Sequence, residues 1–176
     1  METITFASDR ATNEFLKDLR QLLETAFTGR FSDEDWEHGL GGIHIAVQDS
    51  GVLVSHAAVV PRRIYISGHV YSCGYVENVA TLPTLRGRGF ASLAVREANE
   101  IIKSKYEIGT LSTSGKNFYR TLGWEDWKGP SYVLTHGEWI RSESEDHGLM
   151  VLRTDSLSAL DFSSPIACEA RSGDSW

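Results

Sequence analysis

The chain has 176 residues, of which 41% are hydrophobic, and this suits one globular domain with a core of its own. Its formal net charge of -7 at pH 7 argues against binding to a nucleic-acid backbone, which depends on clustered Lys and Arg side chains. An acidic balance suits a cationic substrate, although many proteins without such a substrate are equally acidic. We therefore expect a single domain over residues 1–176 that does not bind nucleic acid.

The cysteines, the histidines and the N-terminal residues narrow the class of protein further. Cys73 and Cys168 are too few and too far apart for a disulfide framework or a zinc site, so we interpret both as core thiols. His38, His44 and His56 show no metal-ligand spacing. The first ten residues lack the basic and apolar segments of a signal peptide, and no stretch approaches the roughly eighteen apolar residues of a membrane helix. The sequence thus predicts a cytoplasmic protein that needs no metal and binds no membrane.

The spacing of apolar residues predicts a mixed α/β (α+β) chain in which strands outnumber helices. In chain order we expect a strand over 3–6, a helix over 15–27, a short helix from 32, a hairpin over 43–60, a strand over 70–82, a helix over 89–103, a strand over 107–113, a short helix over 115–122, and strands over 131–135, 149–155 and 164–170. Ser32 and Asp35 have the spacing of a capping box, and residues 49–51 mark the first hairpin turn. We interpret the polar stretch 138–148 as a surface loop. The short hairpins favour a largely antiparallel sheet with helices on its faces.

The segment Arg86–Gly89 reads Arg-Gly-Arg-Gly and lies between a predicted strand and a predicted helix. A glycine-rich loop at a helix N-terminus presents unpaired backbone N–H groups, which can bind an anion such as a diphosphate. The chain matches neither G-K-[ST] nor G-x-G-x-x-G here, which excludes a P-loop and the dinucleotide-binding fingerprint. The pattern alone leaves two other interpretations open, because such glycines also occur in simple turns and in nucleic-acid-binding tails.

Arg86, Gly89 and Ala91 form the pattern R-x-x-G-x-A, which resembles the acetyl-coenzyme A pyrophosphate motif of the GCN5-related N-acetyltransferases, the GNAT superfamily. The stretch NFYRTLGWEDW is similar to the family segment in which a helix ends in a Tyr before a Gly-aromatic pair. More narrowly, DEDWEHGLGGIH, CGYVENVA, RGRGFAS and RSGDSW resemble stretches of the aminoglycoside 2'-N-acetyltransferases, and they are spread over most of the chain. The resemblance implies the GNAT fold, in which strands 4 and 5 of a mixed, largely antiparallel sheet splay apart and hold acetyl-coenzyme A.

The resemblance also implies an activity, namely transfer of acetyl from acetyl-coenzyme A to the 2'-amino group of an aminoglycoside, with antibiotic resistance as the result, and it implies a homodimer. Such a transfer needs a deprotonated amine, a polarised carbonyl and a proton for the leaving thiolate. Glu77 lies between apolar strand neighbours, where an acid is out of place unless it faces a cleft or solvent, and the family position implies the base. Tyr119 matches the family's general acid, with an ordinary phenol pKa of about 10, although a core aromatic is the alternative.

Together these considerations give a set of predicted site residues. The predicted catalytic residues are Glu77 and Tyr119. The predicted cofactor-binding residues are Asn78, Val79, Ala80, Arg86, Gly87, Arg88, Gly89, Phe90, Ala91 and Ser114. The predicted substrate-binding residues are Arg30, Asp35, Trp36, Glu77, Asp146, Asp174 and Trp176. Carboxylates suit a polycation because each charge-assisted hydrogen bond contributes about 1.5 to 3 kcal/mol before desolvation.

The final residues and two departures from the family pattern refine this prediction. We expect the Trp176 ring to anchor the chain end while its terminal carboxylate and Asp174 face the sugar amines. Arg30 stands where better-known members have an acid, which disfavours an all-cationic sugar such as gentamicin or kanamycin and favours one that also carries a carboxylate, such as kasugamycin. A substrate-site acid of the family aligns with either Asp146 or His147.

Two other functions stay open on the sequence. One is acetylation of a polyamine or of a protein or peptide amine by the same machinery. The other is a sensor that binds acetyl-coenzyme A without turnover, which would have no need of Glu77 or Tyr119.

Overall fold

The computed structural model describes residues 2–157 and 160–176 of the chain. The contacts between residues divide it into two compact units. The first unit comprises residues 1–60 and 76–100, and the second comprises residues 61–75 and 101–176. Two long strands and one helix run from one unit into the other, so the units are interleaved along the chain. The prediction of a single domain stays a prediction.

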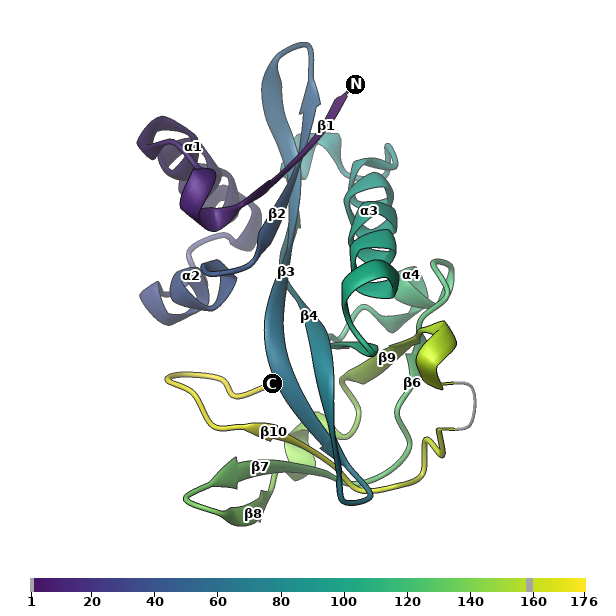
Figure 1. Ribbon diagram of the computed structural model, residues 1–176. Helices are drawn as coiled ribbons and strands as arrows, with labels where there is room; N and C mark the ends of the chain where they lie inside the picture. Colours follow the sequence, from purple (N-terminus) through teal and green to yellow (C-terminus); the bar gives the residue numbers. More distant parts are fainter. Residues whose placement is uncertain (1, 158–159) are drawn as a thin grey trace. The chain divides into compact units, whose positions relative to one another are not determined.

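The helices and strands alternate broadly as the sequence predicts (Figure 1). The strands are β1 (Glu2–Ala7), β2 (Ile43–Asp49), β3 (Val52–Ile66), β4 (His69–Thr81), β5 (Ile108–Ser112), β6 (Glu125–Asp126), β7 (Ser131–Thr135), β8 (Glu138–Arg141), β9 (Leu149–Arg153) and β10 (Ile166–Glu169). The helices are α1 (Asn13–Phe27), α2 (Asp33–Gly39), α3 (Phe90–Lys105) and α4 (Lys116–Arg120). The strand order is β6-β9-β5-β4-β3-β10-β7-β8, with β2 joining β3 and β1 joining β2. A mixed sheet with flanking helices is therefore confirmed.

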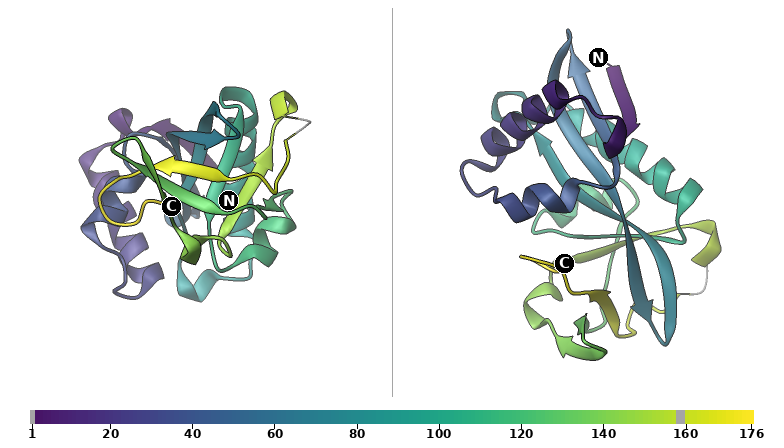
Figure 2. Two further views of the ribbon diagram at one scale, coloured as in Figure 1. Left: turned by 90° about the horizontal axis from the view of Figure 1, so that it is seen from below. Right: turned by 60° about the vertical axis from the view of Figure 1, so that its left-hand side comes forward.

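In the first unit, β1, β2 and the first half of β3 are antiparallel neighbours. Helices α1 and α2 cover one face of these strands, and the first half of α3 lies on the other face (Figure 1; Figure 2, right). Apolar residues of α1 repeat at helical spacing and pack against Ala80 of β4. The buried α1 residues in this cluster are Leu19, Leu22, Leu23 and Ala26. The helical period of the sequence thus fixes which face of α1 covers the sheet.

In the second unit, β5 pairs in parallel with β4 over Cys73–Tyr75 and antiparallel with β9. Strand β10 lies between β3, to which it is antiparallel, and β7, to which it is parallel (Figure 2, left). Apolar side chains from these strands form one core cluster that includes Cys73, Cys168 and the last residue, Trp176. Both cysteines are buried free thiols, which confirms their interpretation as core residues.

The stretch 138–148, expected to be a surface loop, contains a strand. Residues Glu138–Arg141 form β8, which pairs antiparallel with β7. All four β8 side chains are exposed at the edge of the sheet, so no alternation of buried and exposed residues marked the strand. Among the described residues, no helix is long and apolar enough to cross a membrane.

Candidate active site

The predicted site residues are divided between the two units. The first unit carries Glu77 to Ala80 on β4, the loop from Arg86 to Gly89, the start of α3, and the predicted substrate residues Arg30, Asp35 and Trp36. The second unit carries Ser114, Tyr119, Asp146, Asp174 and Trp176.

Strand β4 is distorted at Asn78, directly after the predicted base. Asn78 has a φ of 52°, in the left-handed region that residues other than glycine rarely adopt. A left-handed residue within a strand changes the direction of the backbone groups on either side of it. Glu77, Asn78 and Val79 are all partly exposed, whereas Ala80 is buried. We call this distortion the β4 bulge, and it lies directly after the predicted base Glu77.

Helix α2 holds the bulge from one side. The Asn78 side-chain amide donates a hydrogen bond of 3.2 Å to the carbonyl oxygen of Asp35. Gly39 of α2 leaves the space for it, because a Cβ at Gly39 would collide with the Asn78 amide nitrogen. The stretch DEDWEHGLGG therefore fixes the position of Asn78 in two ways: the Asp35 carbonyl accepts from the Asn78 side chain, and Gly39 leaves room for it.

Asp35 also forms the capping box that its spacing predicts. The Ser32 hydroxyl accepts from the Asp35 N–H at 3.1 Å, and the Asp35 carboxylate accepts from the Ser32 N–H at 2.9 Å. The carboxylate is partly exposed. One of its oxygens is therefore engaged in starting α2.

The Arg-Gly-Arg-Gly loop leads into the first turn of α3. Gly87 and Gly89 have φ values of 77° and 86°, and no atom lies within 4 Å of the position a Cβ would occupy on either residue. The loop backbone is therefore open to close approach by a diphosphate. The Arg86 guanidinium donates at 2.7 Å to the carbonyl of Ala26, near the C-terminus of α1, while Arg88 is exposed. Phe90 is buried and Ala91 is partly buried in α3.

Trp36 and Arg30 lie close to α1 in sequence or in space. The Arg20 guanidinium of α1 is 5.6 Å from the centre of the Trp36 ring, and Arg20 also pairs with Asp33 and Glu24. Trp36 packs against the core cluster of the first unit and borders a hollow beside α1. Arg30 is exposed just beyond the end of α1.

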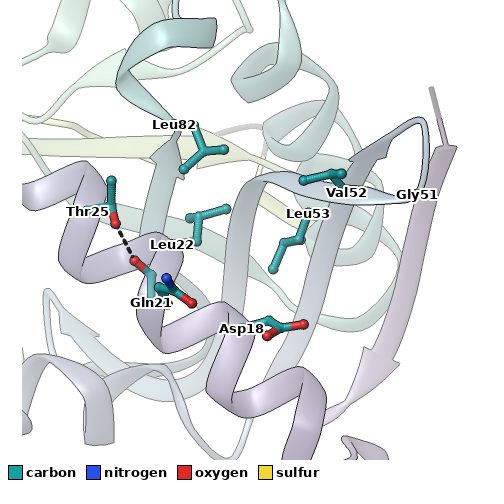
Figure 3. A pocket seen from close by; sticks show the side chains of 8 residues that line it. All are labelled: Asp18, Gln21, Leu22, Thr25, Gly51, Val52, Leu53 and Leu82. Carbon is teal, nitrogen blue, oxygen red and sulfur yellow. Dashed lines mark hydrogen bonds between the residues drawn. The ribbon is translucent and has the colours of Figure 1, made fainter.

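A pocket of about 440 Å³ lies between α1 and the β2–β3 turn (Figure 3). It is lined by Asp18, Gln21, Leu22, Thr25, Gly51, Val52, Leu53 and Leu82. Its polar lining is partly engaged within α1, since the Thr25 hydroxyl donates to the Gln21 carbonyl at 2.7 Å. None of these residues belongs to the predicted site.

In the second unit, Tyr119 ends the short helix α4, as the resemblance implies. Its ring makes edge contacts with Phe118 and Trp124, at centroid distances of 4.9 and 6.1 Å. Tyr119 is 9% exposed, and burial raises the pKa of its phenol above the ordinary value. The phenol therefore stays protonated at neutral pH and can donate a proton. Ser114 is exposed in the loop before α4.

The end of the chain is packed into the second unit. Trp176 is 4% exposed within the core cluster, and its indole N–H donates to the Ser142 hydroxyl at 3.2 Å. The backbone N–H of Trp176 donates to the Asp174 carboxylate at 3.1 Å. Arg171 donates to the Asp174 carbonyl at 2.7 Å. The ring thus anchors the chain end, and the exposed Asp174 is held beside the terminal residue.

Asp146 contributes to the same anchor. Its carboxylate accepts hydrogen bonds from the Arg141 guanidinium, and from the Ser131 N–H and hydroxyl at 2.9 and 2.8 Å. The Arg141 hydrogen bond, aided by Ser131, lowers the Asp146 pKa to about 2. Ser131 in turn lies 3.0 Å from the Ser142 hydroxyl that receives the Trp176 indole. Asp146 therefore supports the Trp176 site, whereas His147 is exposed.

Two buried residues beside the β4 bulge, one on β2 and one on β3, were not predicted from the sequence. His56 and His44 are buried and joined to each other and to Asn78 by hydrogen bonds. Their sequence positions could have indicated the pair, because each histidine lies inside an apolar stretch, IHIAV or SHAAV. A polar side chain buried in such a stretch requires a hydrogen-bond partner. In the part of the chain that the structure describes, no group of three or more His, Cys, Asp or Glu could hold a metal ion.

Comparison with known proteins places the chain among acetyltransferases. Residues 8–126 match the acetyltransferase (GNAT) domain. An aminoglycoside 2'-N-acetyltransferase of Mycolicibacterium fortuitum is 38% identical over 161 residues, which cover 89% of this chain and 83% of that protein.

Solved structures agree in fold. A GNAT family N-acetyltransferase (YhbS) from Escherichia coli in complex with CoA matches 96% of this chain and 90% of its own, with a TM-score of 0.68 and 14% identity. A GCN5-related N-acetyltransferase from Anabaena variabilis matches 73% of this chain with a TM-score of 0.61 and 20% identity, although the match spans only 33% of that longer chain. The family-model match covers more than half of the residues and the relative is 38% identical over 89% of the chain, so the chain belongs to the acetyltransferases of the GNAT family.

Proposed function

We propose that this protein transfers an acetyl group from acetyl-coenzyme A to the 2'-amino group of an aminoglycoside. The observation that carries the proposal is the left-handed Asn78 directly after Glu77 in β4, in a chain 38% identical to an aminoglycoside 2'-N-acetyltransferase. Acetylation removes a cationic amine with which the drug binds ribosomal RNA, and resistance follows.

The residues around the glycine loop fit acetyl-coenzyme A. Gly87 and Gly89 leave the loop backbone open, α3 begins directly behind it, and Arg88 adds an exposed positive charge. Acetyl-coenzyme A supplies the acetyl group as a thioester. The N–H groups of β4 after Asn78 bind its carbonyl oxygen and pantetheine arm, and Ser114 contributes a hydroxyl.

Glu77 and Tyr119 divide the proton transfers between them. Glu77 takes a proton from the substrate ammonium through a water molecule and so produces the neutral amine that attacks. Tyr119, whose pKa is raised by burial, returns a proton to the departing thiolate. A sensor without turnover would require neither group.

Carboxylates and one arginine determine which aminoglycoside the enzyme prefers. Asp35 and Asp174 attract the ammonium groups, and Asp146 acts by supporting the packing of Trp176, whose N–H holds the Asp174 carboxylate. The exposed Arg30 favours a substrate that carries a carboxylate, such as kasugamycin, over gentamicin or kanamycin. Arg30→Asp should therefore shift the preference toward gentamicin, and an unchanged preference would refute this role of Arg30.

A panel of amines tests the function. Thiol release from acetyl-coenzyme A is followed with aminoglycosides, polyamines and peptides at equal concentration. The proposal expects turnover with an aminoglycoside that has a 2'-amino group. Turnover with polyamines or peptides alone would assign one of the other amine classes, and binding of acetyl-coenzyme A without turnover on any amine would indicate a sensor.

The assembly and location follow as further proposals. We expect a homodimer in the cytoplasm, where acetyl-coenzyme A is made. The edge strand β8 supports an interface between copies, because it exposes Trp139 and Ile140 to 39% and 51%. Light scattering on the purified protein tests this, and a monomer at micromolar concentration would contradict it.

A further inference from the structure

A continuous chain of hydrogen bonds runs through the first unit to the bulge of β4. The Ser8 hydroxyl lies 2.8 Å from His44 Nε2, His44 Nδ1 lies 3.0 Å from His56 Nε2, and His56 Nδ1 lies 3.0 Å from the carbonyl oxygen of Asn78. The two histidines are 1% and 0% exposed. We call Ser8, His44 and His56 the histidine relay. It joins the end of β1 to β2, β3 and β4.

The register of the strands brings the two rings together. His44 of β2 is paired with Ala58 of β3, and His56 of β3 is paired with Ala46 of β2. His44 and His56 are therefore diagonal neighbours on one face of the sheet. Their ring centres are 5.2 Å apart.

The last acceptor determines which nitrogen of each ring carries the proton. A carbonyl oxygen can only accept, so His56 Nδ1 is the donor to Asn78 and His56 Nε2 must accept from His44. His44 Nδ1 is then protonated, and its Nε2 can only accept. The single proton of the Ser8 hydroxyl therefore goes to Nε2 at 2.8 Å rather than to the Gly42 carbonyl at 3.1 Å, which already accepts from the Ser8 N–H. Desolvation lowers the pKa of His44 to about 4 and that of His56 to about 3, so both rings are neutral at pH 7. Each histidine is thereby held in one tautomer.

The carbonyl oxygen that accepts from His56 belongs to Asn78, the left-handed residue of β4. A left-handed residue other than glycine costs about 1 to 3 kcal/mol and persists only where its surroundings fix it. Asn78 is fixed at two points, since its side chain donates to Asp35 and its carbonyl accepts from His56. In a planar trans peptide the C=O and the following N–H point in opposite directions. The His56 hydrogen bond therefore turns the Val79 N–H away from His56.

We propose that the histidine relay positions the Asn78–Val79 peptide, and with it the Val79 N–H and the neighbouring Glu77, for acetyl transfer. The inference rests on the proposed function, in which the N–H groups of β4 bind the thioester. The relay orients and does not conduct protons, because the carbonyl at its end cannot take up a proton and release it on the other side. His44 and His56 are thus positioning residues, while Glu77 keeps the role of base.

Paired amide substitutions at His56 separate this role from simple packing. Asn places its amide nitrogen as many bonds from the backbone as His Nδ1, so His56→Asn keeps a donor for the Asn78 carbonyl. Gln places its amide one bond farther along the side chain, so His56→Gln loses that geometry. We expect His56→Gln to lower kcat by about tenfold or more with little change in KM, because small misplacements of reacting groups are costly. His56→Asn should retain most of the kcat.

A neighbouring serine offers a matched control. Ser55 is fully buried on the same strand, and its hydroxyl donates at 2.6 Å to the carbonyl of Ala80, beyond the bulge. Ser55→Ala should lower stability and leave kcat close to that of the unmodified enzyme. Equal kcat values for His56→Asn and His56→Gln, or a loss in Ser55→Ala as large as in His56→Gln, would overturn the inference.

A measurement without turnover keeps the test independent of the substrate. The amide resonance of Val79 in ¹⁵N-labelled protein should move in His56→Gln and return toward its original position in His56→Asn, because it reports on the orientation of that peptide. An unmoved resonance in folded His56→Gln would overturn the inference even if the enzyme acetylates aminoglycosides. Failure of the amine panel together with the expected resonance shifts would count against the proposed function and leave the positioning of the peptide supported.

Discussion

Replacing Trp176 with Ala should both destabilise the protein and weaken its binding of the aminoglycoside. The Trp176 ring is 4% exposed in the core cluster of the second unit. A buried aromatic of this size removes roughly 200 Å² from water, which is worth about 5 kcal/mol at about 25 cal/mol per Å². Because a chain end can relax into the vacated space, we expect a loss near the lower limit for such substitutions, about 3 kcal/mol.

Urea unfolding measures the stability loss, and steady-state kinetics measure the binding. With a slope of about 2 kcal/mol per molar urea, a loss of about 3 kcal/mol lowers the midpoint by about 1.5 M. The KM for the aminoglycoside should rise and the KM for acetyl-coenzyme A should stay the same, because the Asp174 carboxylate, which accepts from the Trp176 N–H, loses its anchor.

Val70→Ala is the control in the same unit, since Val70 is 53% exposed on β4. An exposed substitution of this kind changes stability by less than about 0.5 kcal/mol. If Trp176→Ala left both the urea midpoint and the KM for the aminoglycoside unchanged, the chain end would have no role as an anchor and the reasoning would be refuted.

Glu77→Gln should lower kcat far more than it weakens acetyl-coenzyme A binding, measured by calorimetry; equal losses would indicate a structural role. Tyr119→Phe should lower kcat because it removes the proton donor for the leaving thiolate; a full rate in this variant would exclude the general acid. His44 has a folded pKa of about 4, lowered by burial, so the unfolded chain binds more protons below about pH 6.5. Stability should therefore be greatest above that pH and fall by about 3 kcal/mol toward pH 4, and urea midpoints that stay constant over this range would contradict a buried neutral ring.

The sequence predicts the parts of the fold that are set by local pattern. The helical period of α1 and the alternation of the early strands are visible in the chain itself. The hydrogen bonds between Ser32 and Asp35 confirm the capping box expected from their spacing. Strand β8 was not predicted because both of its faces are exposed. Strand β6 was not predicted because it has only two residues.

The parts of the site that the sequence does not predict depend on contacts between distant residues. The strand register that places His44 beside His56 cannot be read from either apolar stretch alone. The hydrogen bonds of the Asp146 carboxylate depend on the β7–β8 hairpin, because the hairpin brings Arg141 and Ser131 together beside it. The left-handed Asn78 was not predicted, because its neighbours in sequence give no turn signal.

The most direct test of the central claim is the position of the acetyl group on the product. The enzyme is given acetyl-coenzyme A and either an aminoglycoside with a 2'-amino group or its counterpart with a 2'-hydroxyl, and the products are examined by mass spectrometry and NMR. The account predicts one acetyl group per molecule, on the 2' nitrogen, and no thiol release with the counterpart. Acetylation at another amine, or equal rates with both compounds, would contradict it.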